Sequence, residues 1–156
     1  MKELTCFFTG HRNLPIDLIR RILMKLDAEI DRLIGDGVTD FISGGALGFD
    51  QIAASLIIAK KQMGRNIRLV LALPCRDQDQ FWNERQRALY QNLLKEADEI
   101  IYISERYSPL CMKKRNRYMA DRSAYCMCAL LKERSGTART VRYAHIKGIE
   151  VINVAL

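Results

Sequence analysis

The stretch Phe41-Ile42-Ser43-Gly44-Gly45-Ala46-Leu47-Gly48-Phe49-Asp50 decides the fold, because an apolar run breaks into glycines and continues as a helix. Residues 39–43 have the pattern of a buried strand, and residues 48–62 carry apolar side chains at helical spacing. Glycines at such a turn let the backbone come close to a ligand, since they lack a Cβ atom. The N–H groups at the start of the helix favour an anion, most often a phosphate. The stretch therefore predicts a nucleotide or phosphosugar binder, with a tight turn that holds no ligand as the alternative.

Apolar runs alternate with helical patterns along the whole chain. We expect strands at 4–9, 39–43, 67–73, 99–103, 124–131 and 150–154, and helices at 15–34, 48–62, 78–95, 111–122 and 136–147. Pro74 is expected to end the third strand. Strands separated by helices indicate a parallel sheet that is covered on both faces. With 156 residues and no repeat or linker, the sequence predicts a single Rossmann-like α/β domain over 1–156, its sheet mostly parallel with helices on both faces.

Composition limits the function classes. No apolar stretch approaches the roughly 20 residues that a membrane-spanning helix needs, and Lys2-Glu3 leads directly into a strand-like run without a signal peptide. We therefore expect a cytoplasmic protein with no membrane partner. The five cysteines form an odd set without a CxxC pair, and the chain has only two histidines. This pattern favours reduced, buried thiols and argues against a metal site. We expect no cofactor.

The net charge of +7 suggests anionic partners. Basic residues form the run Lys113-Lys114-Arg115-Asn116-Arg117 and recur at Arg122, Lys132, Arg134, Arg139 and Arg142. Two interpretations stay open. The residues form a solvated basic face, or they steer a phosphate-bearing ligand to its site.

In parallel α/β sheets the ligand binds beyond the carboxyl ends of the strands, near the switch point. That rule selects four segments: 9–12, 43–50, 74–82 and 132–140. In the first segment, Thr9-Gly10-His11-Arg12, the arginine fork suits a pair of phosphate oxygens. His11 could shuttle a proton, but we favour an ordinary hydrogen-bonding role for it.

Further candidates lie on the expected helices. Asp50 either compensates the dipole of its helix or hydrogen-bonds a sugar hydroxyl. Gln78 and Trp82 are four residues apart and are expected to share a helix face. Trp82 stacks on a base or, as we favour, covers the core. Ser135-Gly136-Thr137 caps the last helix or donates to an anion.

Together these segments resemble the SLOG superfamily, which joins DprA/Smf DNA-processing proteins to LOG-type nucleotide hydrolases. They are most similar to its stand-alone YpsA-like branch. The resemblance covers nearly the whole chain. It is carried by Phe8–Arg12, Ser43–Asp50, Pro74 with Gln78 and Trp82, Arg115–Met119 and Ser135–Thr137. It implies a Rossmann-like fold, recognition of a nucleotide-derived molecule such as ADP-ribose or NAD, and a homodimer.

The resemblance also bears on catalysis. LOG-type enzymes cleave the N-glycosidic bond of nucleoside monophosphates with an arginine, which Arg115 matches, and a glutamate, whose place holds Thr140. A threonine supplies no carboxylate for an oxocarbenium-like transition state. Such hydrolysis would need Asp50 or Asp121 instead, so we assign no catalytic residue. DprA-like relatives bind single-stranded DNA, which is a further alternative.

The leading hypothesis is a bacterial regulatory or sensor protein that binds a small nucleotide-derived ligand. Its expected binding residues are Thr9, Gly10, His11, Arg12, Ser43, Gly44, Gly45, Ala46, Gly48, Asp50, Gln78, Trp82, Arg115, Asn116, Ser135, Gly136 and Thr137.

Overall fold

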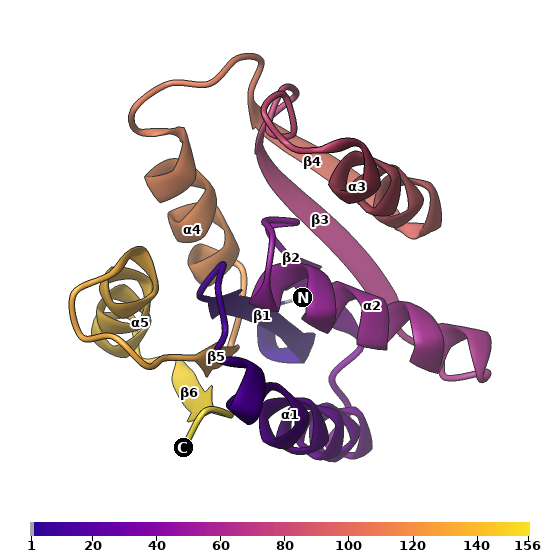
Figure 1. Cartoon of the computed structure of the whole chain (residues 1–156). Helices are drawn as coiled ribbons and strands as arrows, with labels where there is room; N and C mark the ends of the chain where they lie inside the picture. Colours follow the sequence, from indigo (N-terminus) through magenta and orange to yellow (C-terminus); the bar gives the residue numbers. More distant parts are fainter. Residues whose placement is uncertain (1) are drawn as a thin grey trace.

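The structure, a computed structural model, describes residues 2–156. A short 3-10 helix at Lys2–Leu4 precedes six strands that alternate with five α-helices (Figure 1). The strands are β1 (Thr5–Gly10), β2 (Asp40–Ser43), β3 (Arg68–Cys75), β4 (Glu99–Ser104), β5 (Tyr125–Ala129) and β6 (Glu150–Asn153). The helices are α1 (Ile16–Gly35), α2 (Phe49–Gln62), α3 (Glu84–Glu96), α4 (Cys111–Asp121) and α5 (Gly136–Ile146).

All strand pairs of the sheet are parallel, in the order β4-β3-β2-β1-β5-β6. Strands β2, β3 and β4 are added one after another on one side of β1. The chain then crosses back through α4 and places β5 on the other side of β1. The switch point therefore lies between β1 and β5. Phe7 of β1 is opposite Ile42 on one side and Cys126 on the other. The predicted single Rossmann-like α/β domain is confirmed.

Alternate residues of β1 face two separate cores. Phe8 packs in the core under α1, α2 and α3, where its ring stacks on Phe41 at 6.0 Å and meets the edge of Phe49 at 6.4 Å. Phe7 packs in the core under α4 and α5, with Met119 and Val141. Figure 1 shows α4 and α5 side by side on the left, away from α1, α2 and α3. Helices cover both faces, as predicted.

The five cysteines are free and buried. Cys126 and Cys128, two residues apart on β5, lie in the same core, as their spacing predicts. Within residues 2–156, no helix combines the length and apolar character that crossing a bilayer requires.

Pro74 does not end β3, which continues to Cys75 opposite Ser104. The N–H of Arg68 donates to Thr39 on the β2 side, whereas the carbonyl of Leu69 accepts from Asp98 on the β4 side. Even-numbered residues of β3 therefore direct their backbone groups toward β2. Since β2 stops at Ser43, opposite Leu71, the missing N–H of Pro74 costs the sheet no hydrogen bond.

The helix predicted at 78–95 begins later, at Glu84. Asn83 caps it: its side chain accepts the N–H of Gln86 at 2.8 Å, while the Gln86 side chain accepts the N–H of Asn83 at 3.1 Å. This reciprocal capping box fixes where the helix starts. Gln78 and Trp82 therefore lie in the turns before α3, and the prediction that they share a helix face is wrong.

We expect Asn83→Ala to lower the free energy of unfolding by about 1 kcal/mol, because the cap satisfies a helix N–H that alanine leaves unpaired. Asn92→Ala, an exposed change within α3, is the matched control and should be neutral or slightly stabilising. Urea denaturation of the two variants measures the difference. Equal effects would show that the cap does not hold the start of α3.

Candidate functional site

The loop between β2 and α2 folds back on itself through its own hydrogen bonds. The Ser43 hydroxyl donates to the Asp50 carbonyl at 2.8 Å and accepts the Gly45 N–H at 3.2 Å. The N–H of Ala46 donates to the Asp50 carboxylate, and that of Phe49 donates to the His11 carbonyl at 3.2 Å. Three N–H groups of the loop are thus used by the protein's own oxygen atoms.

Gly48 is required by both conformation and contact. Its φ of 87° and ψ of −129° lie in a region that is open almost only to glycine. A Cβ atom at this position would overlap the backbone carbonyl of Arg12. Gly48 therefore brings the start of α2 directly against the loop that follows β1.

Gly44 leaves room for a buried arginine. A Cβ atom there would overlap the Arg115 guanidinium and lie 2.9 Å from an Asp50 carboxylate oxygen. Arg115 is 3% exposed, and its Nη1 donates to the Gly44 carbonyl at 2.7 Å. Its Nε donates to the side-chain oxygen of Asn116 at 2.8 Å. The arginine of α4 thus anchors the glycine loop from the opposite face of the sheet.

Asp50 and Arg115 form a buried pair of opposite charges beside this glycine. Burial raises the pKa of Asp50 to about 6, while attraction to Arg115 and the Ala46 N–H oppose that rise. Burial also lowers the pKa of Arg115, against the pull of Asp50. The charges of Asp50 and Arg115 offset each other within the wall of the site. The main role of the pair is therefore to position the loop.

His11 connects the β1 loop to the β5 loop. Its Nε2 accepts the N–H groups of Leu131 at 2.9 Å and Lys132 at 3.2 Å. A nitrogen that accepts carries no proton, so the ring is neutral with its hydrogen on Nδ1. Burial, and then the nearby Lys132, lower the pKa of His11 and keep it neutral. His11 makes the kind of hydrogen bonds that we favoured for it.

A cavity of about 890 Å³ lies over the carboxyl ends of β1 to β4; we call it the main cavity. Its lining residues are Arg12, Asn13, Leu47, Gly48, Cys75, Asp77, Gln78, Gln80, Phe81, Trp82, Gln86, Tyr107 and Met112. Arg12 and Gly48 come from the first two loops of the sheet, and the turns at 76–82 supply most of the rest. The carboxyl edge of the sheet, where the sequence predicts the binding site, therefore carries a cavity on the β4 side of the switch point.

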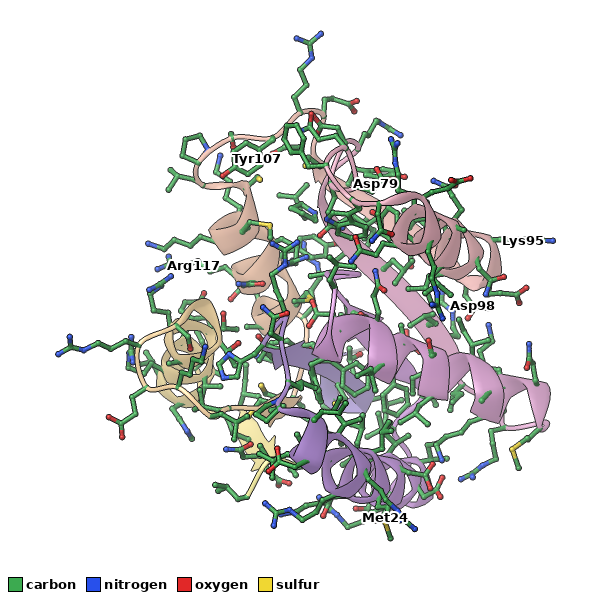
Figure 2. All side chains as sticks on the ribbon, viewed as in Figure 1. Met24, Asp79, Lys95, Asp98, Tyr107 and Arg117 are labelled. Atoms are coloured by element: carbon green, nitrogen blue, oxygen red, sulfur yellow. The ribbon has the colours of Figure 1, made fainter. Side chains whose placement is uncertain are left out.

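The main cavity has an aromatic wall. Phe81 is 90% exposed and Tyr107 is 61% exposed. Trp82 is half-buried and meets the edge of Tyr90 at 5.0 Å, so its ring belongs partly to the core, as we favoured. Tyr107 stands in the loop above α4, across from the turn that carries Asp79 (Figure 2). Such faces can stack on a planar ring.

Gln78 joins the cavity to the glycine loop. Its Nε2 donates to the Tyr90 hydroxyl at 3.0 Å and to the Gly44 carbonyl at 3.4 Å. Its Oε1 is buried and has no hydrogen-bond partner within residues 2–156. The amide therefore presents an unused acceptor at the inner wall.

The expected binding residues divide into three groups. Arg12, Gly48, Gln78 and Trp82 line the main cavity. Thr9, Gly10, His11, Ser43, Gly44, Gly45, Ala46, Asp50 and Arg115 do not line it and pack behind it. Asn116 and Gly136 line a second cavity between α4 and α5, Ser135 lines a third, and Thr137 is buried in α5. Ser135 caps α5 by accepting the N–H of Ala138 at 3.1 Å.

Sequence reasoning missed Phe81 and Tyr107 as lining residues. Tyr107 follows β4, and the carboxyl-edge rule that selected four other segments would also have selected the segment after this strand. Its N–H donates to the Asp77 carboxylate at 3.1 Å, which holds the two loops together. Within residues 2–156, no group of three or more His, Cys, Asp or Glu side chains is placed to hold a metal.

We expect Gly48→Ala to lower the free energy of unfolding by about 3 kcal/mol or more, because a strained φ and an overlap with the Arg12 backbone add together. Gly64→Ala is the matched control: its φ is +94°, but open space surrounds the position. It should cost only about 1–2 kcal/mol. Equal losses in urea denaturation would contradict the close contact.

Asp50→Asn tests the buried pair through pH. Because the native pKa is raised from 3.8 to about 6, the stability that Asp50 contributes is present below the lower value and lost as the pH rises through the higher one. The free energy of unfolding of the parent minus that of Asp50→Asn should fall by about 3 kcal/mol between about pH 3 and 7. A difference that rises with pH would mean that Arg115 holds the carboxylate charged.

Relatives of known sequence span most of the chain. The uncharacterized SPbeta prophage-derived protein YoqJ of Bacillus subtilis is 35% identical over 133 residues, which cover 77% of this chain and 78% of YoqJ. The UPF0398 protein BH1768 of Halalkalibacterium halodurans is 31% identical over 123 residues, covering 78% of this chain and 62% of that protein.

Solved structures share the fold. DNA processing protein A (DprA) from Streptococcus pneumoniae superposes with a TM-score of 0.71 over 96% of this chain at 17% identity, and the chain spans 49% of its length. DprA from Helicobacter pylori, described by its single-stranded DNA binding mode, gives a TM-score of 0.68 over 96% of this chain at 18% identity, covering 64% of that chain. The sequence pattern of the YspA SLOG family matches residues 2–151, so the chain belongs to this family.

Proposed function

We propose that the chain binds a small nucleotide-derived ligand, such as a nucleotide, ADP-ribose or an NAD-like molecule, in the main cavity. The observation that carries this proposal is the cavity itself, about 890 Å³ at the carboxyl edge of a parallel sheet. Small-molecule sites usually enclose about 300–1,000 Å³ and combine apolar walls with a few polar groups. A nucleotide fits this size and this chemistry.

Different residues of the cavity lining suit the base and the phosphate of such a ligand. Phe81 and Tyr107 offer exposed ring faces to a base, and the amides of Gln80 and Gln86 offer hydrogen bonds to its edge. Arg12 lies beside Gly48, at the N-terminus of α2, where a phosphate is favoured.

This arrangement changes which groups we expect to bind the phosphate. The N–H groups of Gly45, Ala46 and Phe49 already donate to Ser43, Asp50 and His11. We therefore assign the phosphate to Arg12 and the Leu47–Gly48 end of the loop, which line the cavity. Asp50 and Arg115 act as positioning residues that shape this end from behind.

A sensor or regulatory role in the cytoplasm, with two copies of the chain in a homodimer, completes this proposal. Its support is the resemblance of the sequence to the SLOG superfamily, which implies recognition of a nucleotide-derived molecule and a homodimer.

A hydrolase is the second candidate, because one carboxylate, Asp77, lines the main cavity. Thr140 does not replace the missing glutamate: its hydroxyl donates to the Gly136 carbonyl at 3.0 Å. Asp121 lies at the far end of α4, where it accepts from the Tyr143 hydroxyl at 2.6 Å. An N-glycosidic cleavage would therefore use Asp77 to stabilise the oxocarbenium-like transition state.

The test is calorimetric titration with AMP, ADP, ADP-ribose, NAD and ribose 5-phosphate. We expect binding that weakens about tenfold or more in Arg12→Gln and Phe81→Ala, because one loses the charged fork and the other the stacking ring. Arg20→Gln, an exposed change on α1, is the control and should bind like the parent. Chromatography of the same mixtures for released base tests the hydrolase.

Binding that is indifferent to both Arg12→Gln and Phe81→Ala would contradict the proposed site. Base release that disappears in Asp77→Asn would establish the second candidate in place of binding alone.

A further inference from the structure

The side-chain amide of Gln78 is held in one orientation. Its Nε2 donates both hydrogens, one to the Tyr90 hydroxyl at 3.0 Å and one to the Gly44 carbonyl at 3.4 Å. An oxygen atom in the place of Nε2 would face that carbonyl oxygen with no hydrogen between them. The amide oxygen, Oε1, therefore occupies the other position and is the acceptor that the Gln78 side chain offers.

The oxygen of this amide has no donor. Among the side chains of residues 2–156, Gln78 Oε1 is the one buried nitrogen or oxygen atom that lacks a hydrogen-bond partner. Most buried polar atoms in proteins are satisfied, so one that is not needs an explanation. Because Oε1 is already removed from water, a donor that reaches it gains a hydrogen bond without displacing water from this atom. Gln78 lines the main cavity, so a ligand bound there is the natural source of that donor.

A second acceptor precedes Gln78 in the chain. Asp77 also lines the main cavity. Its carboxylate accepts the N–H of Tyr107 and the side-chain amide of Gln80, each at 3.1 Å, and it hydrogen-bonds the Cys75 thiol. A carboxylate accepts about four hydrogen bonds, so Asp77 has room for one more donor. In the part of the chain that the structure describes, residues 2–156, no Lys, Arg or His forms an ion pair with it.

These two acceptors lie between the groups assigned to the base and to the phosphate. Gln78 hydrogen-bonds Gly44, in the loop that continues to Gly48, where the phosphate is assigned. Phe81, which is assigned to the base, follows Gln78 by three residues. In a nucleotide the sugar joins the base to the phosphate. The groups of the ligand nearest to Asp77 and Gln78 are therefore the ribose hydroxyls, which are hydrogen-bond donors.

We propose that Gln78 Oε1 and the Asp77 carboxylate accept hydrogen bonds from the 2′- and 3′-hydroxyls of a ribose, so that the main cavity selects ribonucleotides whose diol is free. This inference rests on the proposed function and specifies the class of its ligand. A deoxyribose leaves one acceptor unfilled. A phosphate on the diol brings negatively charged acceptors against the Asp77 carboxylate. The cavity therefore discriminates against both kinds of nucleotide.

Asp50 is not placed for this contact, although its position in the sequence suggested a hydrogen bond to a sugar hydroxyl. Its carboxylate accepts the Ala46 N–H and lies beside the Arg115 guanidinium. Asp50 and Arg115 lie behind the main cavity and do not line it. The sugar contact therefore belongs to Asp77 and Gln78, in the turns after β3.

Access of a hydroxyl to Gln78 Oε1 requires a small movement of the turns at 76–82. The atom has almost no contact with solvent, although its residue lines the cavity. The side chains of Gln80 and Phe81 in the same turns are exposed, so a shift of this segment breaks few packing contacts. A ribose hydroxyl therefore reaches the amide by displacing the turns, while the strands of the sheet stay in place.

The experiment compares the affinities of AMP, 2′-deoxy-AMP and 3′-deoxy-AMP by calorimetric titration. We expect each missing hydroxyl to weaken binding about tenfold or more, because a site built to hydrogen-bond a hydroxyl discriminates against a ligand that lacks it. NAD and NADP, which differ by a phosphate on one ribose 2′-oxygen, form a second pair. NADP should bind about tenfold or more weakly than NAD, because its extra phosphate meets the Asp77 carboxylate.

Gln78→Met is the decisive variant, because it keeps the length of the side chain and removes the acceptor. The preference for AMP over one of the two deoxy analogues should then disappear. A merely structural disturbance of the glycine loop would weaken all three ligands alike and leave the ratios of their affinities unchanged. Gln91→Met, the same exchange at an exposed position of α3 outside the cavity, is the matched control and should keep the preference.

Asp77→Asn tests the second acceptor through its charge. The variant keeps the shape of the side chain and removes the repulsion of a phosphate on the diol. The difference in affinity between NAD and NADP should therefore narrow by about fivefold, as expected for two charges about 4 Å apart near water.

The outcomes separate this inference from the proposed function. Equal binding of AMP and both deoxy analogues, or equal binding of NAD and NADP, would overturn the selection of a free diol and leave nucleotide binding intact. A preference for AMP over both analogues that survives in Gln78→Met would mean that other groups contact the diol, which contradicts the role of Gln78. If none of the five compounds binds, the proposed function fails, and the inference that rests on it fails as well.

Discussion

The contact between the Arg115 guanidinium and the backbone of Gly44 is the constraint on which the carboxyl edge of the sheet depends. It joins α4, on one face, to the loop that opens α2, on the other, through a hydrogen bond of 2.7 Å between residues 71 positions apart. A side chain at Gly44 would displace the guanidinium, and the carboxylate of Asp50 would then lose its counter-charge in a buried place. The glycines that suggested a ligand cradle serve this internal packing first.

The strands and helices could be predicted because they follow from the local spacing of apolar residues along the sequence. The strand at 39–43 and the glycine turn after it differ from β2 and its loop by a single residue at the start. The residues that line the main cavity from 9–12, 43–50 and 74–82 were selected by one rule about parallel sheets. Local pattern and topology together were enough to find the hollow edge.

Other features could not be predicted, since they depend on contacts distant in sequence. Nothing local marks Arg115 as buried, because a basic helix usually faces solvent. The spacing of Gln78 and Trp82 suggested one helix face, but the capping box at Asn83 starts the helix beyond both. The expected cluster of Ser135, Gly136 and Thr137 lies on the far side of α4 from the aromatic wall, because α5 packs against α4.

Unequal strand lengths explain why there is a hollow at all. β2 ends at Ser43, whereas its neighbour β3 runs on through Pro74 to Cys75 and stays paired with β4. The sheet therefore has a step, and the unpaired flank of β3 above it could recruit an extra strand from another molecule. A proline on that flank offers no donor, so the step resists such β-augmentation and its floor stays accessible to solutes.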